Sequence, residues 1–540
     1  MKGRPVGASC LTLAQAARFK ITVVWLVWLC VPFVATAHVG SPNVFFEGKA
    51  GPYPLHVVIQ PPDVVPGLAE ISVRVEGQGI NQITALPIKW NAGRKGAPPP
   101  DVAKLVRGQT NLYVAQLWFM EGGSQSVEIE VHGASGNGRV TIPVDAVATR
   151  VLGMPKPLVL ALGGLGLLLA ALLLSVIGAA VRESVLEPGE KPSLRRRWLA
   201  RGALGLAGAL LVAALWGGKH WWDAEAADYR NNRLYRAISA QAHVRAEAAG
   251  RRILHLEIID PRFAHSAPLV PDHGKLMHLF LIQEPTLEAF AHLHPIKLDR
   301  KTFETVLPQL PAGIFKIYAD VTYETGFSDT LTTSVEMPSD IPASSAGLDP
   351  DDSWRIALPV KAKENNECEI SGKYLMKRSF DHEVVVNQPI KLQFSVHDRK
   401  GEPVILEPYL GMRGHLALRR ADGSVFTHLH PGGSASMAAM RLSVLRAEGK
   451  LPLKAAFGED DPICQLPEIS EGEQDWLRGN KSDDASVAFP YAFPKAGIYR
   501  LWVQVKIKGE ILTGVYDVEA RLQHPGEPLG RARTQVNAGL

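Results

Sequence analysis

Alternating apolar and polar residues predict short β-strands along most of the chain outside two long apolar runs. Residues 55–59, 70–75 and 126–131 alternate with the period of two that is typical of strands with one buried face. Turn signals such as Pro61-Pro-Asp and Gly122-Gly123 separate them. We therefore expect residues 38–150 to form an all-β domain, most simply an Ig-like β-sandwich.

The two apolar runs predict a membrane hairpin. Residues 157–181 carry no charge and are long enough to span a bilayer. Residues 199–218 are at the short end of the spanning range, with Trp198 before them and Trp221-Trp222 after them as interfacial anchors. The loop at 182–198 is rich in Lys and Arg, so the positive-inside rule places it in the cytoplasm. Both flanking parts of the chain are then outside.

The N-terminal sequence predicts that the chain after it is exported, which agrees with the orientation of the hairpin. Basic residues precede an uncharged apolar run that ends in Ala35-Thr-Ala37, as in a signal peptide with a small-x-small cleavage site. We expect residues 1–37 to be a signal peptide or a signal anchor.

The chain after the second apolar run contains two copies of one pattern. Alternating strands end in Asp at 253–260 and at 390–398, and a Pro–Gly turn precedes a second strand at 310–313 and at 493–497. These copies predict tandem β-sandwiches. The expected boundaries are a juxtamembrane stalk at 219–249, the first repeat at 250–338, a linker at 339–384, the second repeat at 385–520 with an insertion at 441–486, and a tail at 521–540.

Each copy carries three histidines in the same order. His278 precedes His292 by 14 positions, and His415 precedes His428 by 13. The second histidine of each set opens a His-Leu-His-Pro box, whose two imidazoles point to one face of a strand. Neutral imidazole is the commonest side-chain ligand for Zn, Cu and Ni. The predicted metal ligands are His278, His292, His294, His415, His428 and His430, with His273, Met277 and Met412 as further donors nearby.

The two histidine sets lead to one expectation and one alternative. Because the copies form separate domains, the two sites should act independently. The alternative is that the histidines are structural and hydrogen-bond to backbone where the strands end at proline.

The remaining composition narrows the function. The formal charge of +4 comes without a Lys/Arg run with interleaved aromatics, which argues against nucleic acid as a partner. No Walker loop, dinucleotide fingerprint, nucleophile elbow or zinc-protease helix motif is present in the sequence, so we expect no enzyme. Two of the four cysteines lie in the export signal, and the other two, Cys368 and Cys464, are expected to form a disulfide in an oxidising compartment.

Several phrases resemble YtkA-like domains, which are Ig-like β-sandwich modules of bacterial envelope proteins related in fold to CopC-type copper-binding proteins. They are Asp398-Arg-Lys-Gly-Glu-Pro-Val404, Gly414-His-Leu, Phe426-Thr-His-Leu-His-Pro431 and Ala496-Gly-Ile-Tyr499. The segment Ala37-His-Val-Gly, with the residues after it, resembles the same group, including FixH-like segments. The likeness covers most of the chain outside the membrane spans, but tandem domains tied to a membrane hairpin depart from the CopC-type pattern. It implies copper handling more than catalysis.

Cleavage after Ala37 would leave His38 as the first residue, whose α-amine and imidazole form a chelate suited to Cu(II). We therefore expect a bacterial inner-membrane protein with both external parts in the periplasm. It would bind copper, with zinc as the alternative, for storage, delivery or resistance. The expected partners are the lipid bilayer and other envelope metal-handling proteins. The competing hypotheses are a non-catalytic Ig-like scaffold subunit and a metal-dependent envelope enzyme.

Overall fold

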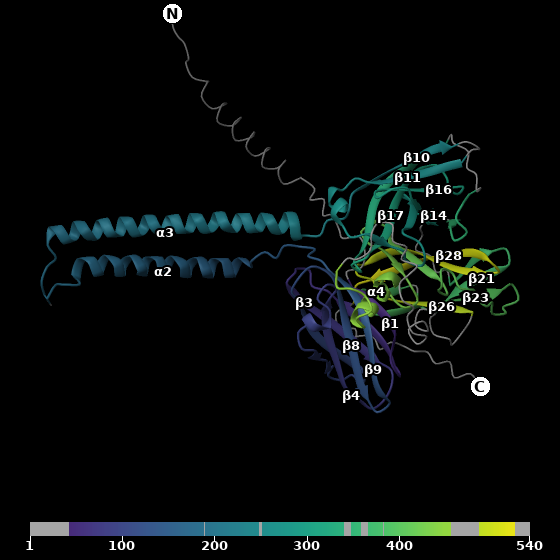
Figure 1. The fold of residues 1–540 in the computed structure, drawn as a ribbon, viewed down its shortest axis with the longest axis horizontal. Coiled ribbons are helices and arrows are strands. Elements are labelled where there is room, and N and C mark those ends of the chain that lie inside the picture. Colours follow the sequence, from purple (N-terminus) through teal and green to yellow (C-terminus); the bar gives the residue numbers. More distant parts are fainter. Residues whose placement is uncertain are drawn as a thin grey trace, which may run out of the picture. The chain divides into compact units, whose positions relative to one another are not determined.

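The computed structural model describes residues 43–187, 189–247, 251–339, 347–357, 366–381, 383–454 and 485–523. The expected signal, His38, Cys464 and the end of the tail lie outside these ranges. The described chain is mainly β, arranged in several largely antiparallel sheets, with two long apolar helices between the first and second groups of strands (Figure 1). This confirms the mainly β fold class.

The N-terminal β domain consists of two sheets packed on one core. Their strand orders are β1-β2-β3-β7-β6 and β5-β4-β8-β9. Leu55 and Ile71 from one sheet and Ile129 and Val144 from the other are fully or almost fully buried in the same apolar cluster. The bounds are β1 Val44–Ala50, β2 Tyr53–Gln60, β3 Gly67–Val75, β4 Ile80–Lys89, β5 Asp101–Val102, β6 Lys104–Leu105, β7 Leu112–Phe119, β8 Gly123–Gly133 and β9 Gly136–Ala146.

Two helices, α2 (Lys156–Glu183) and α3 (Leu194–Asp228), are long and apolar enough to cross a membrane. Ala200 is the one buried residue among them, so neither helix is packed into an apolar core of the described chain. Both exceed the expected spans. They run side by side where Gly178 of α2 faces the Leu204 side chain of α3.

The expected stalk at 219–249 is only partly helical. After α3, strand β10 (Ala240–Glu247) pairs with β11 (Arg251–Ile258) and belongs to the first repeat. Its Ala-rich composition favours a helix in isolation, but pairing with β11 provides backbone partners that outweigh this weak local preference.

The first repeat comprises two sheets, β10-β11-β16-β15 and β12-β17-β13-β14-β19, and β18 also pairs with β17. The two sheets enclose an apolar core that includes Leu256, Leu279 and Phe303. The further bounds are β12 Leu269–Val270, β13 His278–Gln283, β14 Ala289–Leu293, β15 Ile296–Lys297, β16 Thr302–Val306, β17 Gly313–Tyr323, β18 Ser328–Met337 and β19 Ser353–Ile356.

The second repeat has the corresponding arrangement, with sheets β20-β21-β23-β26 and β22-β28-β27-β24-β25. Its core includes Phe394, Leu416 and Tyr516. The bounds are β20 Glu367–Ser371, β21 Tyr374–Arg378, β22 Glu383–Val385, β23 Ile390–Asp398, β24 His415–Arg420, β25 Phe426–Leu429, β26 Ser486–Tyr491, β27 Gly497–Ile507 and β28 Glu510–Arg521, with helix α4 at Met437–Ala447.

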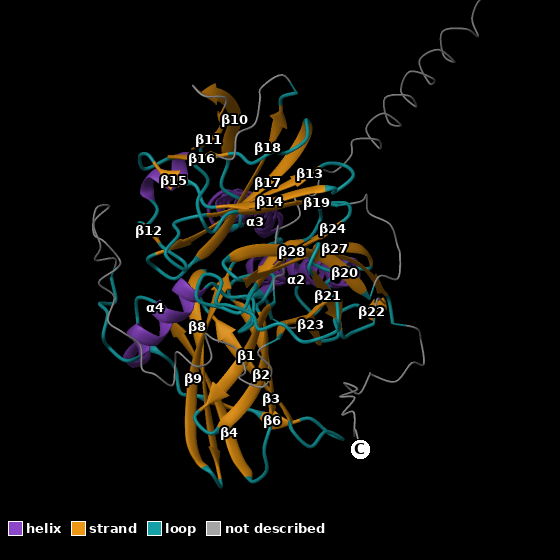
Figure 2. Cartoon of the chain, turned by 90° about the vertical axis from the view of Figure 1, so that its right-hand side faces the viewer, coloured by secondary structure: helices purple, strands orange, loops and turns teal. Residues whose placement is uncertain are grey.

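The predicted linker at 339–384 was too wide. It supplies β19, which pairs with β14 of the first repeat, and β20 and β21, of which β21 pairs with β23 of the second. The insertion at 441–486 begins inside α4, which packs against β9 of the N-terminal domain (Figure 2).

The two repeats pack against each other through a second apolar cluster. Phe290 of β14 stacks on Trp502 of β27 with ring centroids 4.8 Å apart, and Tyr318 of β17 stacks on Phe426 of β25 at 4.0 Å. Strand β14 is consequently buried on both faces, one in its own core and one in this interface. The histidine boxes lie at the edge of this interface.

Candidate metal centre

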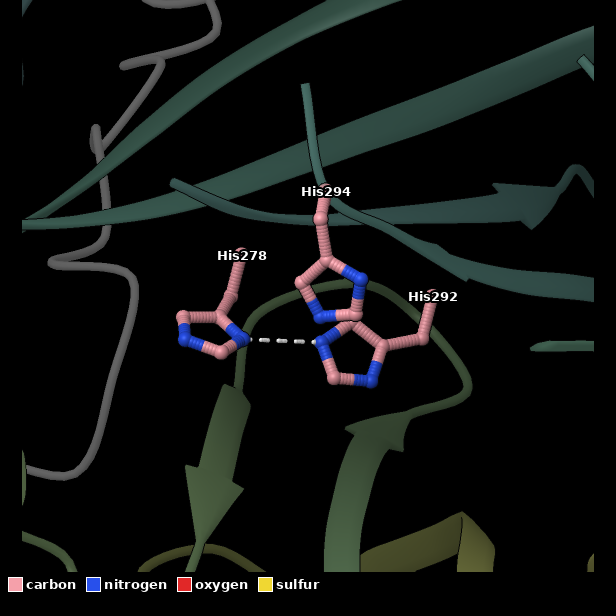
Figure 3. A group of neighbouring side chains, drawn as sticks. All are labelled: His278, His292 and His294. Carbon is pink, nitrogen blue, oxygen red and sulfur yellow. Dashed lines mark hydrogen bonds between the residues drawn. The ribbon is translucent and has the colours of Figure 1, made fainter. Parts of the chain in front are cut away.

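Strand geometry directs the histidines of the first repeat away from its core. Leu293 is buried in the core of the repeat, while its neighbours His292 and His294 point to the opposite face. His278 begins β13, and its Nδ1 faces His292 Nε2 at 3.1 Å (Figure 3). The prediction that the His-Leu-His box presents both imidazoles on one face is confirmed.

The second repeat repeats this geometry. Leu429 lies in its core, between the outward-facing His428 and His430, and His415 Nδ1 lies 3.0 Å from His428 Nε2. In each copy the three histidines can bring one nitrogen each to within 4.8 Å of the others.

The two sets form one cluster rather than two separate sites. Ring centroids are 4.5–5.3 Å apart within a set, and those of His278 and His292 lie 5.5–6.5 Å from those of His415 and His428. His278 lies 5.5 Å from His428, and His292 lies 5.7 Å from it. The structure therefore contradicts the expected separation of the sites, because the docking of the repeats brings both sets into one interface.

His273 joins the cluster from the first repeat but lies beside the second set. Its ring centroid is 5.3 Å from His415 and 5.2 Å from His430. It occupies a tight turn with φ of 52°, and Leu410 occupies the corresponding turn of the second repeat with φ of 51°. We use "histidine cluster" for these seven residues: His273, His278, His292, His294, His415, His428 and His430.

In the first set, the outer nitrogen of each ring contacts an oxygen. His278 Nε2 lies 3.2 Å from the Asp272 carbonyl oxygen, His292 Nδ1 lies 2.9 Å from Gln504 Oε1, and His294 Nδ1 lies 3.0 Å from Asp352 Oδ1. The Gln504 amide nitrogen donates to Ser353 Oγ, which leaves its oxygen facing His292. Contacts of this kind fix the tautomer and orientation of metal-binding imidazoles.

These contacts determine where the lone pairs lie. A carbonyl oxygen only accepts, so His278 carries its hydrogen on Nε2 and His292 carries its hydrogen on Nδ1. In neutral rings, His278 Nδ1 and His292 Nε2 are then both bare, yet they face each other at 3.1 Å. Two lone pairs at this distance repel, and a cation placed between them relieves the repulsion.

The second set is held less firmly. His430 Nδ1 lies 3.3 Å from the Ala435 carbonyl oxygen, and His428 Nδ1 lies 3.5 Å from Asp320 Oδ2. Among the described residues, four buried imidazole nitrogens have no hydrogen-bond partner, namely Nε2 of His273, His294, His415 and His430. Leaving a buried polar group unpaired lowers the free energy of unfolding by about 1–3 kcal/mol, so a ligand bound to these nitrogens would stabilise the fold.

Burial lowers the pKa of every imidazole in the cluster, with the neighbouring rings as a further cause in most. The pKa falls to about 3 for His273 and His430. The rings are therefore neutral near pH 7, which is the form that binds a metal ion.

The donors fit a transition metal ion. Nitrogens bound tetrahedrally to one ion at zinc-type distances lie roughly 3.3 Å apart, close to the 3.0 and 3.1 Å separations of the facing pairs. Imidazole-only donor sets suit Zn, Cu and Ni. Asp349, which could join His294 and Asp352 around an ion, is held by Lys275 Nζ at 2.7 Å.

The other predicted site residues lie elsewhere or outside the described ranges. Met277 is fully buried in the apolar core of the first repeat, on the face opposite His278, so it is not a ligand. Met412 is buried beside Tyr409, whose ring lies 4.9 Å from His415. His38 is outside the described residues. Cys464 is too, so its disulfide with Cys368 stays a prediction.

Sequence reasoning noted Asp272 near the first set but missed the other residues that contact the imidazoles: Asp320, Asp352 and Gln504. One signal was available for two of them. Aligning the Pro–Gly turns of the two copies places Asp320 and Gln504 at the same position, seven residues after Gly313 and Gly497. No spacing rule pointed to Asp352.

Comparisons with known proteins identify part of the second repeat. Residues 371–460, which include His415, His428 and His430, match a family model described as a domain of unknown function, DUF8832. No curated protein matches the chain. The match covers too little of the chain to assign the whole protein to that family.

Solved structures resemble the chain only weakly. An engineered protein is 17% identical over 16% of this chain and 17% of its own, with a TM-score of 0.14. A Salmonella alpha-2-macroglobulin mutant is 10% identical over 91% of this chain and 24% of its own, with a TM-score of 0.18. A bacterial ice-binding adhesin is 6% identical over 89% and 97%, with a TM-score of 0.12. Neither fold nor function follows from likenesses of this size.

Proposed function

We propose that the protein is a membrane-anchored metal-binding protein whose histidine cluster holds two transition metal ions, one for each set of three histidines. The observation that carries this proposal is the pair of bare nitrogens, His278 Nδ1 and His292 Nε2, which face each other at 3.1 Å while their outer nitrogens contact oxygens. A bound ion satisfies both nitrogens at once.

A purely structural role fits the cluster less well. Structural histidines use their nitrogens in hydrogen bonds, whereas Nε2 of His294, His415 and His430 lacks such a partner in the described chain. Three unpaired buried nitrogens would lower the stability of the interface by a few kcal/mol in total. Metal ligation gives Nε2 of His294 and His430 a partner, and the neutral rings are in the form that binds a metal ion.

Copper is the ion we propose. Divalent ions bind nitrogen donors most strongly at copper in the Irving–Williams order, and imidazole suits it. The resemblance of the histidine boxes to those of copper-handling envelope domains supports the same choice. Zinc is the alternative, since three imidazoles also form zinc sites. Storage, delivery or resistance are the corresponding roles, carried out with other envelope metal-handling proteins.

We place the histidine cluster in the periplasm of a bacterial inner membrane. Helices α2 and α3 are long and apolar enough to form the anchor. Lys191 lies in the segment joining them, and α3 begins with Leu194-Arg-Arg-Arg197; these basic residues favour the cytoplasmic side. The N-terminal domain and both repeats then lie on the opposite side.

Metal content of the full-length protein in detergent tests the proposal. After chelator treatment and dialysis against Cu(II) or Zn(II), we expect about two equivalents of copper per chain. His292→Ala and His428→Ala should each lower the content, while His255→Ala should not, because His255 lies on β11 and bonds Glu304 at 2.8 Å outside the cluster. Retention of zinc alone would identify zinc as the ion. Folded wild-type protein without either metal would leave the scaffold hypothesis in its place.

A further inference from the structure

A cavity of about 180 Å³ adjoins the histidine cluster. Its lining comes from three parts of the chain. Asp145 belongs to the N-terminal domain, Asp320 and Asp329 to the first repeat, and His428 and His430 to the second. A space of this size holds roughly six water molecules at their liquid volume, enough for a partly hydrated metal ion.

Three carboxylates in this lining form a series that ends at the cluster. Asp145 Oδ2 accepts a hydrogen bond from the Ser328 backbone N–H at 3.1 Å. Asp329, which follows Ser328 in the chain, accepts a hydrogen bond from the Tyr235 hydroxyl at 2.6 Å. Asp320 accepts the Thr330 hydroxyl at 2.6 Å, and its other oxygen lies 3.5 Å from His428 Nδ1. Each residue is therefore held in place by a neutral donor.

The carboxylates also act on one another. Burial is the main cause that raises the pKa of Asp145 to about 8, of Asp320 to about 7 and of Asp329 to about 6. The charge of Asp329 contributes to the shifts of Asp145 and Asp320. A cation that enters the cavity favours the ionised form of these carboxyl groups, so they release their protons as the ion approaches and then attract it.

The basic groups near the cavity are largely engaged elsewhere. Lys275 lines it, but its ammonium group lies 2.7 Å from Asp349 and 3.4 Å from Asp351. Arg262, whose charge acts on Asp329, forms an ion pair with Asp260 at 2.5 Å. These two basic groups therefore pair with other carboxylates and not with Asp145, Asp320 or Asp329.

An unpaired ligand atom supplies an independent sign that the cavity serves a cation. His430 lines the cavity, is only 3% exposed, and its Nε2 has no hydrogen-bond partner in the described part of the chain. His278 and His428 line the same cavity. Donor atoms of both sets are therefore adjacent to a space that an ion can occupy.

We propose that this cavity is the path by which a divalent transition metal ion enters and leaves the histidine cluster, with Asp145 and Asp329 attracting the ion and Asp320 passing it to His428. The inference rests on the proposed function, since it requires the cluster to bind metal. It adds a route and three carboxylates to that function.

The test measures rates rather than metal content. Full-length protein in detergent, freed of metal, is mixed rapidly with Cu(II), and the quenching of tryptophan fluorescence is followed. Carboxylates along a path speed association electrostatically, by about 10-fold or more in steered systems. We expect Asp145→Asn and Asp329→Asn each to slow the association of Cu(II) about 3–10-fold. Removal of bound copper by a chelator should slow by a similar factor. Metal content at equilibrium should stay at the wild-type value.

Two controls keep the outcome interpretable. Asp101→Asn removes a carboxylate from exposed strand β5, outside the cavity, and should leave the rate unchanged. The thermal midpoint of each variant shows whether it is folded. Because burial disfavours the charged form of Asp145 and Asp329, their Asn variants should unfold at the same or a higher temperature.

The outcomes separate this inference from the proposed function. A wild-type protein that binds no metal contradicts both. Normal binding with unchanged rates in both folded variants overturns the path alone. A lower metal content in either variant would make that carboxylate a ligand, which also overturns its role as a path residue. Slower exchange at full metal content is the result that supports the path.

Discussion

Asp320 and Gln504 occupy equivalent positions in the two repeats, and each approaches the middle histidine of the other repeat. Asp320 pairs with His278 across β17 and β13, as Gln504 pairs with His415 across β27 and β24. Asp320 Oδ2 lies 3.5 Å from His428 Nδ1, and Gln504 Oε1 lies 2.9 Å from His292 Nδ1. Each set of histidines is therefore oriented partly by the partner repeat.

The contact of Gln504 with His292 of the other repeat predicts the effect of changing Gln504. Gln504→Leu removes the acceptor that keeps the hydrogen on His292 Nδ1, and loss of such an orienting contact weakens metal binding about 10–100-fold. Gln504→Glu preserves an acceptor and should retain the affinity. Competition titration with a chelator measures both. Gln283→Leu is a matched control, because that amide bonds the Ala312 carbonyl away from the cluster. Equal losses in the Leu and Glu variants would argue against the orienting role.

The proximity of the sets predicts that they are coupled. His292 and His428 have ring centroids 5.7 Å apart. The double variant His292→Ala/His428→Ala should therefore lose an amount of metal-binding free energy that is not the sum of the losses in the two single variants. We expect the two values to differ by about 0.5–3 kcal/mol. A double-mutant cycle by calorimetry checks this. The control cycle of His292→Ala with His255→Ala should be additive within roughly 0.5 kcal/mol. Additivity in both cycles would restore the expectation of independent sites.

Metal-free protein should lose stability as the pH falls from about 6.5 toward 3. In the fold the pKa of His273 is lowered to about 3, so the unfolded chain binds a proton in this window that the folded chain does not. Each such residue contributes a slope of about 1.4 kcal/mol per pH unit while the window lasts. Above the window the ring is neutral in both states and the effect is absent.

The variant His273→Leu isolates this contribution, because Leu410 already occupies the corresponding turn with nearly the same φ. Denaturant unfolding at pH 7, 5.5 and 4.5 should give a flatter profile for the variant than for the wild type. Parallel profiles would show that His273 does not resist protonation.

Membrane topology is open to a direct measurement. Alkaline phosphatase is active only after export, so a fusion after Leu540 should be active and a fusion within 184–193 should be inactive. Each fusion serves as the control for the other, provided both are produced at similar levels. The reverse pattern would place the histidine cluster in the cytoplasm and would remove the periplasmic role.

The sequence contained the local part of the site but not its assembly. Period-two alternation and the duplicated box predicted that His292 and His294 share a face, because that relation depends on strand geometry alone. The meeting of His278 with His428 depends on how two repeats dock, which local patterns do not encode. The same limit explains why His273 was grouped with the first set although its ring lies beside His415 and His430.

The predicted boundaries of the stalk and the linker were wrong for a related reason, because they were based on local composition. Residues 240–247 and 353–356 looked like stalk and linker, but both gain strand partners from the first repeat. Near-continuous burial of β13 and β14 likewise reflects a second packing surface, formed by Phe280, Phe290 and Trp502, that exists only between the repeats.

The contact between His292 and Gln504 also has a consequence for a chain that is still incomplete. These residues are 212 positions apart, and strand β27, which carries Gln504, is the penultimate strand that the structure describes. A nascent chain that ends before β27 contains all six histidines, but it lacks the contact that orients His292 and the strand that pairs with β24. Under the proposed function, a truncated molecule should therefore bind metal more weakly than the finished protein.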